Sequence, residues 1–148
     1  MALEPVDGAT VAGVALPGVA PDKRLLVQTS LHDASVPNLA SFDHARSLGL
    51  PRLSSSVTAP WGFASTVTTS DTGAFVIVDE HPASLPPETN EVFHFDTVAH
   101  DNPRRRTALQ AQMQAFWATG TAADTCTGAC DCTAGHCGPL RTATHGGT

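Results

Sequence analysis

The sequence predicts an α/β fold: part of a mostly parallel sheet, flanked by helices and carrying a β-hairpin insertion. Two segments each contain a strand-like run, then a polar turn, then a helical pattern. Each such segment is half of a βαβ unit. Between these segments lie two β-prone runs around a short polar turn, and these runs predict the hairpin.

The first strand–turn–helix unit begins at residue 24. Residues 24–30 form a short apolar run, which is typical of a buried parallel strand. A polar turn follows over residues 31–38, and Asn38 is suited to cap the next helix. Gly49 is the stop signal of that helix. Its apolar residues have helical spacing: Leu39, Phe42 and Ala45.

The predicted hairpin comprises the β-prone runs 64–69 and 73–79. Asp71 and Gly73 supply turn chemistry between the two runs. Residues 50–63 are rich in proline and serine and predict an irregular segment before the hairpin.

The second unit begins with residues 91–96, whose alternating pattern predicts another sheet strand. Pro103 fits the first turn of a helix capped by Asn102 or Asp101. Gly120 marks the end of that helix. One apolar face is expected to pack on the sheet: Leu109, Met113, Phe116 and Trp117.

Composition divides the chain into three parts. Residues 1–23 show no sustained period and predict an irregular lead-in, whereas residues 24–120 carry the α/β pattern. From residue 121 to 148 the composition turns to threonine, alanine, glycine and cysteine, which predicts a cysteine-rich tail. The 148 residues suffice for one domain with a core but are few for a complete α/β enzyme of large size.

The charge distribution excludes several classes of function. The net charge is −6, and residues 104–106 are the single run of positive charge, expected on a solvated helix turn, so nucleic-acid binding is not predicted. No apolar run approaches the roughly 20 residues of a membrane-spanning helix. The first residues lack signal-peptide features, so we expect either a cytoplasmic protein or a targeting segment on sequence outside this chain.

Four cysteines lie within twelve residues: Cys126, Cys130, Cys132 and Cys137. Their C-x3-C-x-C-x4-C spacing differs from the usual C-x2-C zinc knuckle. Two local disulfides would staple the segment, and Cys130 and Cys132 are too close for an easy mutual bridge, so each is expected to pair with Cys126 or Cys137. Disulfides would favour an extracellular or periplasmic location. Metal binding through reduced thiolates, or a free tail, are the alternatives.

Asp33 and His100 each stand in a polar turn that follows a predicted strand. Functional side chains of open α/β sheets gather beyond the carboxyl ends of parallel strands. A carboxylate that orients an imidazole leaves the second ring nitrogen free to take a proton from a nucleophile. The alternatives are structural: Asp33 as a turn cap and His100 as an ordinary loop histidine. Structural or surface roles are expected for the other histidines considered: His32, His81 and His94.

Four segments carry a resemblance to a known family, namely Leu26–Asn38 (LVQTSLHDASVPN), Ala45–Pro51 (ARSLGLP), Phe93–Asp101 (FHFDTVAHD) and Phe116–Gly120 (FWATG). Over roughly residues 24–120 the chain resembles the C-terminal portion of α/β-hydrolase-fold serine esterases and lipases, including bacterial secreted lipase-like proteins. The resemblance implies a partial hydrolase-type sheet, in which Asp33 orients His100 and His100 acts as general base and then general acid. The order of acid before histidine matches this class.

The chain departs from that family where the nucleophile should lie. No Gly-x-Ser-x-Gly motif is present, since residues 62–66 (GFAST) lack the closing glycine, and the strands expected before the acid are missing. The resemblance therefore implies a hydrolase portion that needs no cofactor, is inactive alone, and works with a missing upstream half or by self-association on an ester or lipid substrate. The alternative is a non-catalytic metal-binding or interaction protein that acts through the cysteine-rich tail.

Overall fold

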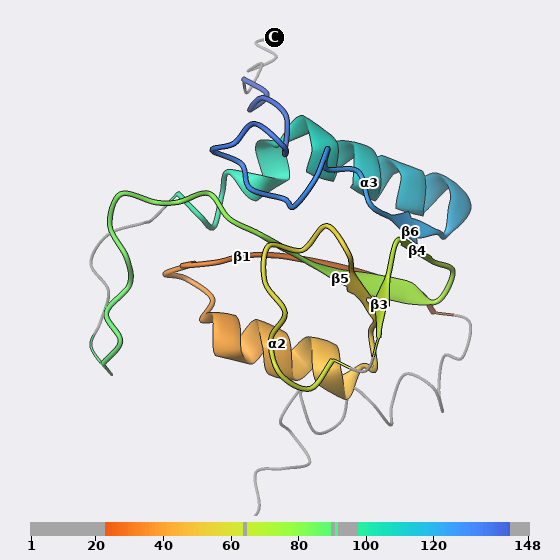
Figure 1. Ribbon diagram of the computed structural model, residues 1–148, viewed down its shortest axis with the longest axis horizontal. Coiled ribbons are helices and arrows are strands. Elements are labelled where there is room, and N and C mark those ends of the chain that lie inside the picture. Colours follow the sequence, from red (N-terminus) through yellow and green to blue (C-terminus); the bar gives the residue numbers. More distant parts are fainter. Residues whose placement is uncertain (1–22, 64, 90, 92–97, 143–148) are drawn as a thin grey trace, which may run out of the picture.

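A mostly parallel sheet lies at the centre of the computed structural model (Figure 1). Its strands follow the order β1-β5-β2-β3, with bounds Leu25–Ser30, Gly73–Val78, Arg52–Leu53 and Thr66–Val67 respectively. The structure describes residues 23–63, 65–89, 91 and 98–142. The predicted lead-in therefore lies outside the described residues except for residue 23, and the predicted strand 91–96, with His94, lies outside them except for residue 91.

β5 is the central strand, and its pairing shows that the predicted hairpin was wrong. β5 runs parallel to β1 over six residue pairs, from Leu25 opposite Gly73 to Ser30 opposite Val78, and it also pairs in parallel with β2. β4 (Thr69–Ser70) instead pairs antiparallel with β6 (Ala122–Ala123). Every residue of β5 is buried, because a strand covered on both faces uses a continuous apolar run.

Two helices cover opposite faces of the sheet (Figure 1). α2 (Asn38–Ser47) lies on one face and α3 (Thr107–Thr119) on the other, after the short 3₁₀ helix η2 (Pro103–Arg105). Gly120 ends α3 in the left-handed conformation, with φ +74°, as the sequence predicts. No described helix has the length and apolar character that crossing a membrane requires.

The prediction that Asn38 caps α2 was wrong, because Asn38 is the first residue of the helix. Pro37 occupies the cap position and makes no side-chain cap hydrogen bond. The Asn38 amide instead ties the preceding turn to the sheet: its oxygen accepts the His32 N–H at 2.9 Å, and its nitrogen donates to the Ser30 carbonyl at 2.5 Å. Asn38 thus orders the turn that carries Asp33.

The side chains of β5 alternate between two hydrophobic clusters. Phe75 and Ile77 pack toward α2, in a cluster with Ala45 and Leu50, and Phe63 stacks on Phe75 with ring centroids 5.1 Å apart. The other cluster lies toward α3 and joins distant parts of the chain: Leu53, Ala74, Val76, Val78, Leu109, Ala122, Cys130, Cys132 and Cys137. Apolar burial on both faces holds the sheet between the helices.

The cysteine segment packs against the end of β5. The prediction of two local disulfides is confirmed, and the pairs are Cys126–Cys130 and Cys132–Cys137. Between the two pairs, Asp131 forms a parallel bridge with Asp79, the residue after β5. The Asp79 N–H donates to the Cys130 carbonyl at 3.0 Å, and the Cys132 N–H donates to the Asp79 carbonyl at 2.9 Å. The segment therefore continues the hydrogen-bonded network of the sheet.

Candidate functional site

The structure brings Asp33 and His100 together across 67 positions of sequence. Nδ1 of His100 lies 2.9 Å from Oδ2 of Asp33, within hydrogen-bond distance. Asp33 stands in the turn after β1, and His100 stands in the turn before η2. A carboxylate and an imidazole thus form a pair at the carboxyl end of β1.

Both oxygens of Asp33 are in use. Oδ1 accepts the backbone N–H groups of Ser35 at 2.7 Å and Val36 at 2.9 Å, which closes the turn on the carboxylate. Oδ2 is left for His100. The side chain is 9% exposed, so water competes little for these bonds. Asp33 therefore closes its own turn through Oδ1 and contacts the imidazole of His100 through Oδ2.

His100 is held on one side and open on the other. The backbone around it forms a tight turn, in which the Asn102 N–H donates to the Val98 carbonyl at 2.9 Å. The imidazole is 36% exposed. Because Nδ1 faces a carboxylate, that nitrogen carries the proton of the neutral ring and Nε2 keeps its lone pair. Among the described residues no hydrogen bond to Nε2 is seen, so it can accept a proton from a third group.

A cavity of about 240 Å³ lies beside the pair. Asp33 and His100 both line it, together with backbone and side chains from the end of β1. Three of its lining residues carry hydroxyls: Thr29, Ser30 and Ser41. The Ser30 hydroxyl donates to the Leu31 carbonyl at 3.2 Å, and within the described part of the chain no serine or threonine hydroxyl bonds to His100. The described residues thus offer a carboxylate–imidazole pair with no hydroxyl group bonded to its imidazole.

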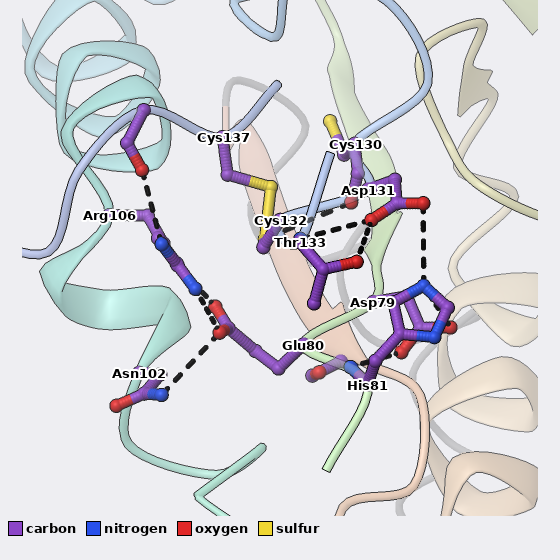
Figure 2. Close-up of polar contacts among 12 residues, drawn as sticks. Asp79, Glu80, His81, Asn102, Arg106, Cys130, Asp131, Cys132, Thr133 and Cys137 are labelled. Carbon is purple, nitrogen blue, oxygen red and sulfur yellow. Dashed lines mark hydrogen bonds and ion pairs between the residues drawn. A yellow bond between two sulfur atoms is a disulfide. The ribbon is translucent and has the colours of Figure 1, made fainter. Parts of the chain in front are cut away.

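A second polar cluster lies at the end of β5 (Figure 2). The Glu80 carboxylate forms a two-pronged ion pair with Arg106, in which Arg106 Nε donates to Oε1 at 2.7 Å and Nη2 donates to Oε2. The hydrogen bond to Glu80 raises the pKa of Arg106 above its usual value, against the opposing effect of burial. The expectation of a solvated arginine turn was wrong for Arg106, because the buried carboxylate draws it inward. Nothing in the spacing of the residues indicates this pair.

Asp131 of the disulfide segment lies with Asp79 and His81 in the same region, beside the Glu80–Arg106 pair (Figure 2). Nε2 of His81 lies 3.5 Å from Asp79 Oδ2 and 3.4 Å from Asp131 Oδ2. Hydrogen bonds from the Ala134 backbone and the Thr133 hydroxyl, with the charge of His81, lower the pKa of Asp131 to about 2. The Asp131 carboxylate therefore organises the loop between Cys132 and Cys137.

The oxidised cysteines bear on the metal-binding alternative. Binding of a metal by cysteine requires thiolates, and both described pairs are disulfides. Across the described ranges no group of three or more histidine, cysteine, aspartate or glutamate side chains is arranged to hold a metal ion. The disulfide form of the segment is the one that the structure shows.

No family model, curated protein or solved structure matches this chain.

Proposed function

We propose that the chain supplies the acid and the base of a Ser-Asp-His triad in a carboxylic-ester hydrolase of the lipase or esterase type. Asp33 is the acid, His100 is the base, and the serine comes from a missing upstream half that is not part of this chain. The observation that carries this proposal is the 2.9 Å contact between Asp33 and the Nδ1 atom of His100, beside an open cavity.

The chemistry follows from which nitrogen is free. Nε2 of His100 takes the proton of the serine hydroxyl as its oxygen attacks the ester carbonyl, and the imidazolium then returns that proton to the departing alkoxide. The same nitrogen next takes a proton from water, whose oxygen attacks the acyl-enzyme, and the imidazolium then gives that proton to the departing serine oxygen as the carboxylic acid is released. Asp33 stays ionised throughout and stabilises the imidazolium.

The exposed side of β1 supports a partner for this chain. Among the described strands β1 is an outer one, paired with β5 alone. A groove of about 340 Å³ runs beside it, lined by Leu26, Gln28, Met113, Phe116 and Trp117. Trp117, which lines this groove, is 73% exposed. The missing upstream half would cover this edge, and self-association is the alternative.

The two disulfides support an oxidising location, extracellular or periplasmic, for the working protein. Ester or lipid substrates would enter through the cavity beside His100.

A fluorophosphonate probe tests the proposal, because it labels a serine only when a triad activates it. We expect the 148-residue chain alone to remain unlabelled. A protein extended by the coding sequence upstream of Met1 should be labelled on a serine of the added segment, and His100→Ala should abolish that label. Labelling that survives His100→Ala would refute the role of His100. Labelling of Ser30, Ser35 or Ser65 in the chain alone would move the nucleophile into this chain.

A further inference from the structure

Glu80 is a buried carboxylate that the proposed chemistry leaves unused. It lies two residues beyond β5, the strand next to the one that leads to Asp33. Its side chain is 1% exposed, while that of its partner Arg106 is 14% exposed. Charged side chains are rarely buried this deeply unless they are paired, and removing one partner of such a pair leaves an uncompensated charge.

The contacts of Glu80 converge on the segment that carries His100 (Figure 2). Oε2 accepts a long hydrogen bond of 3.4 Å from the Asn102 amide, two residues after His100. Both carboxylate oxygens bind Arg106, the residue between η2 and α3. The segment from His100 to α3 is thus fastened to β5 at two points, whereas its only described side-chain bond toward β1 is that of His100 itself.

The backbone between these points leaves little freedom. The Arg105 N–H donates to the Asn102 carbonyl at 2.8 Å, and the Arg106 N–H donates to the Pro103 carbonyl at 3.1 Å. Pro103 is buried. With the Asn102 N–H donating to the Val98 carbonyl, backbone hydrogen bonds thus continue from Arg106 back past His100.

The loop of the Cys132–Cys137 disulfide also contacts Arg106. Arg106 Nη1 donates to the Gly138 carbonyl at 3.2 Å, and Gly138 follows Cys137. The first free N–H groups of α3 find partners there too, since Thr107 donates to the Pro139 carbonyl and Ala108 to the Cys137 carbonyl, each at 3.1 Å. The start of α3 is thereby fixed without a side-chain cap.

We propose that Glu80 is a positioning residue, which through Arg106 and Asn102 sets the distance and angle of His100 relative to Asp33. Glu80 touches neither the imidazole nor the cavity, so it acts on the His100 turn and not on a substrate. This inference rests on the proposed function of the Asp33–His100 pair.

The protonated nitrogen of His100 is the readout, because an imidazole held by Asp33 carries its proton on Nδ1. Nitrogen-15 spectra of the 148-residue chain, at a pH that keeps the ring neutral, measure this tautomer directly. Asp33→Ala defines the unheld ring. We expect Glu80→Gln to lower the fraction of His100 that is protonated on Nδ1 by at least half of the difference between wild type and Asp33→Ala. Asp43→Asn removes a partly exposed ion pair with Arg46, on the opposite side of the sheet from Glu80, and serves as the control, which should match wild type.

A double variant keeps the test decisive if Glu80→Gln does not fold. Glu80→Gln leaves Arg106 buried without its counter-charge, whereas Glu80→Met with Arg106→Met removes both charges and is expected to fold. The double variant should show the same tautomer shift. A folded Glu80→Gln or double variant with the wild-type tautomer would overturn the role of Glu80 alone. A wild-type ring that already matches Asp33→Ala would overturn the Asp33–His100 pair, and with it the proposed function.

Discussion

Opening the Cys132–Cys137 disulfide should cost the protein a measurable part of its stability. The bond closes a loop with a sequence separation of 5, and loop-closure entropy for so short a loop corresponds to about 2 kcal/mol at 25 °C. Cys137 is fully buried and Cys132 nearly so, in the cluster on the α3 side of the sheet. Truncating both to alanine removes packed sulfur as well, so about 2 kcal/mol is the lower end of the expected loss.

Urea unfolding of Cys132→Ala with Cys137→Ala, followed by circular dichroism, measures this loss. The matched comparison is Cys126→Ala with Cys130→Ala, which opens a loop with a sequence separation of 4 and should cost a similar amount. Both double variants should remain more stable than the fully reduced wild type, because each keeps one of the two disulfides. If the oxidised and reduced wild-type proteins unfold at the same urea concentration, the disulfides are not structural staples and the reasoning fails.

Three further results are expected. Glu80→Met should lower the free energy of unfolding by about 3–5 kcal/mol in thermal or urea melts, whereas adding Arg106→Met to that variant should restore most of the loss; equal losses in the single and the double variant would contradict a buried pair. Asp131 has a pKa lowered to about 2, against about 3.9 in an unfolded chain, so its stabilising contribution is complete above that value and lost as the pH falls through about 2. Asp131→Asn should therefore flatten the loss of urea stability between about pH 4 and pH 2, and an unchanged slope would refute this. Gly73→Ala should cost at least about 2 kcal/mol more than Gly49→Ala by the same melts, because a Cβ at Gly73 meets the Leu25 carbonyl oxygen at 2.2 Å, while Gly49, also at positive φ, has open space; similar losses would contradict the close approach.

The sequence pattern located the turn after β1 and the helix α3, and the reason is local, whereas the strand predicted before His100 lies outside the described residues except for residue 91. The apolar run that became β1 and the helical spacing of α3 each follow from a period that survives in the fold. The position of Asp33 in a turn after a strand, and of His100 in a turn before a helix, depends on these elements alone. Their 2.9 Å contact was an expectation from the topology of parallel sheets.

The predicted hairpin was wrong and the strand β2 was missed because both depend on strand pairing between residues far apart in the sequence. Residues 73–78 form a continuous apolar run that suits a hairpin or a buried parallel strand equally, and periodicity does not distinguish the two. The short strand β2, Arg52–Leu53, lies in a segment expected to be irregular, and its hydrogen bonds depend on β5 and β3. Two-residue strands carry no period of their own, so their existence is decided by their neighbours.

The buried charges were missed for a related reason. Glu80 and Arg106 are 26 positions apart, and each alone resembles a solvated surface residue. Arg106 stands beside two exposed arginines, which made its triplet look like a uniform solvated turn. Only the packing of the disulfide segment against η2 and β5 shows that the third member faces inward.

Ester hydrolysis by the protein extended upstream of Met1 tests the central claim most directly, with three single variants measured in parallel. His100→Ala should lower kcat by about 10⁶-fold and Asp33→Ala by about 10⁴-fold, as expected for the base and the acid of a triad. His81→Ala is the matched control, since His81 also lies against carboxylates but away from the cavity, and it should retain wild-type kcat. Wild-type rates in His100→Ala, or equal losses in His81→Ala and His100→Ala, would contradict the assignment of His100 as the catalytic base.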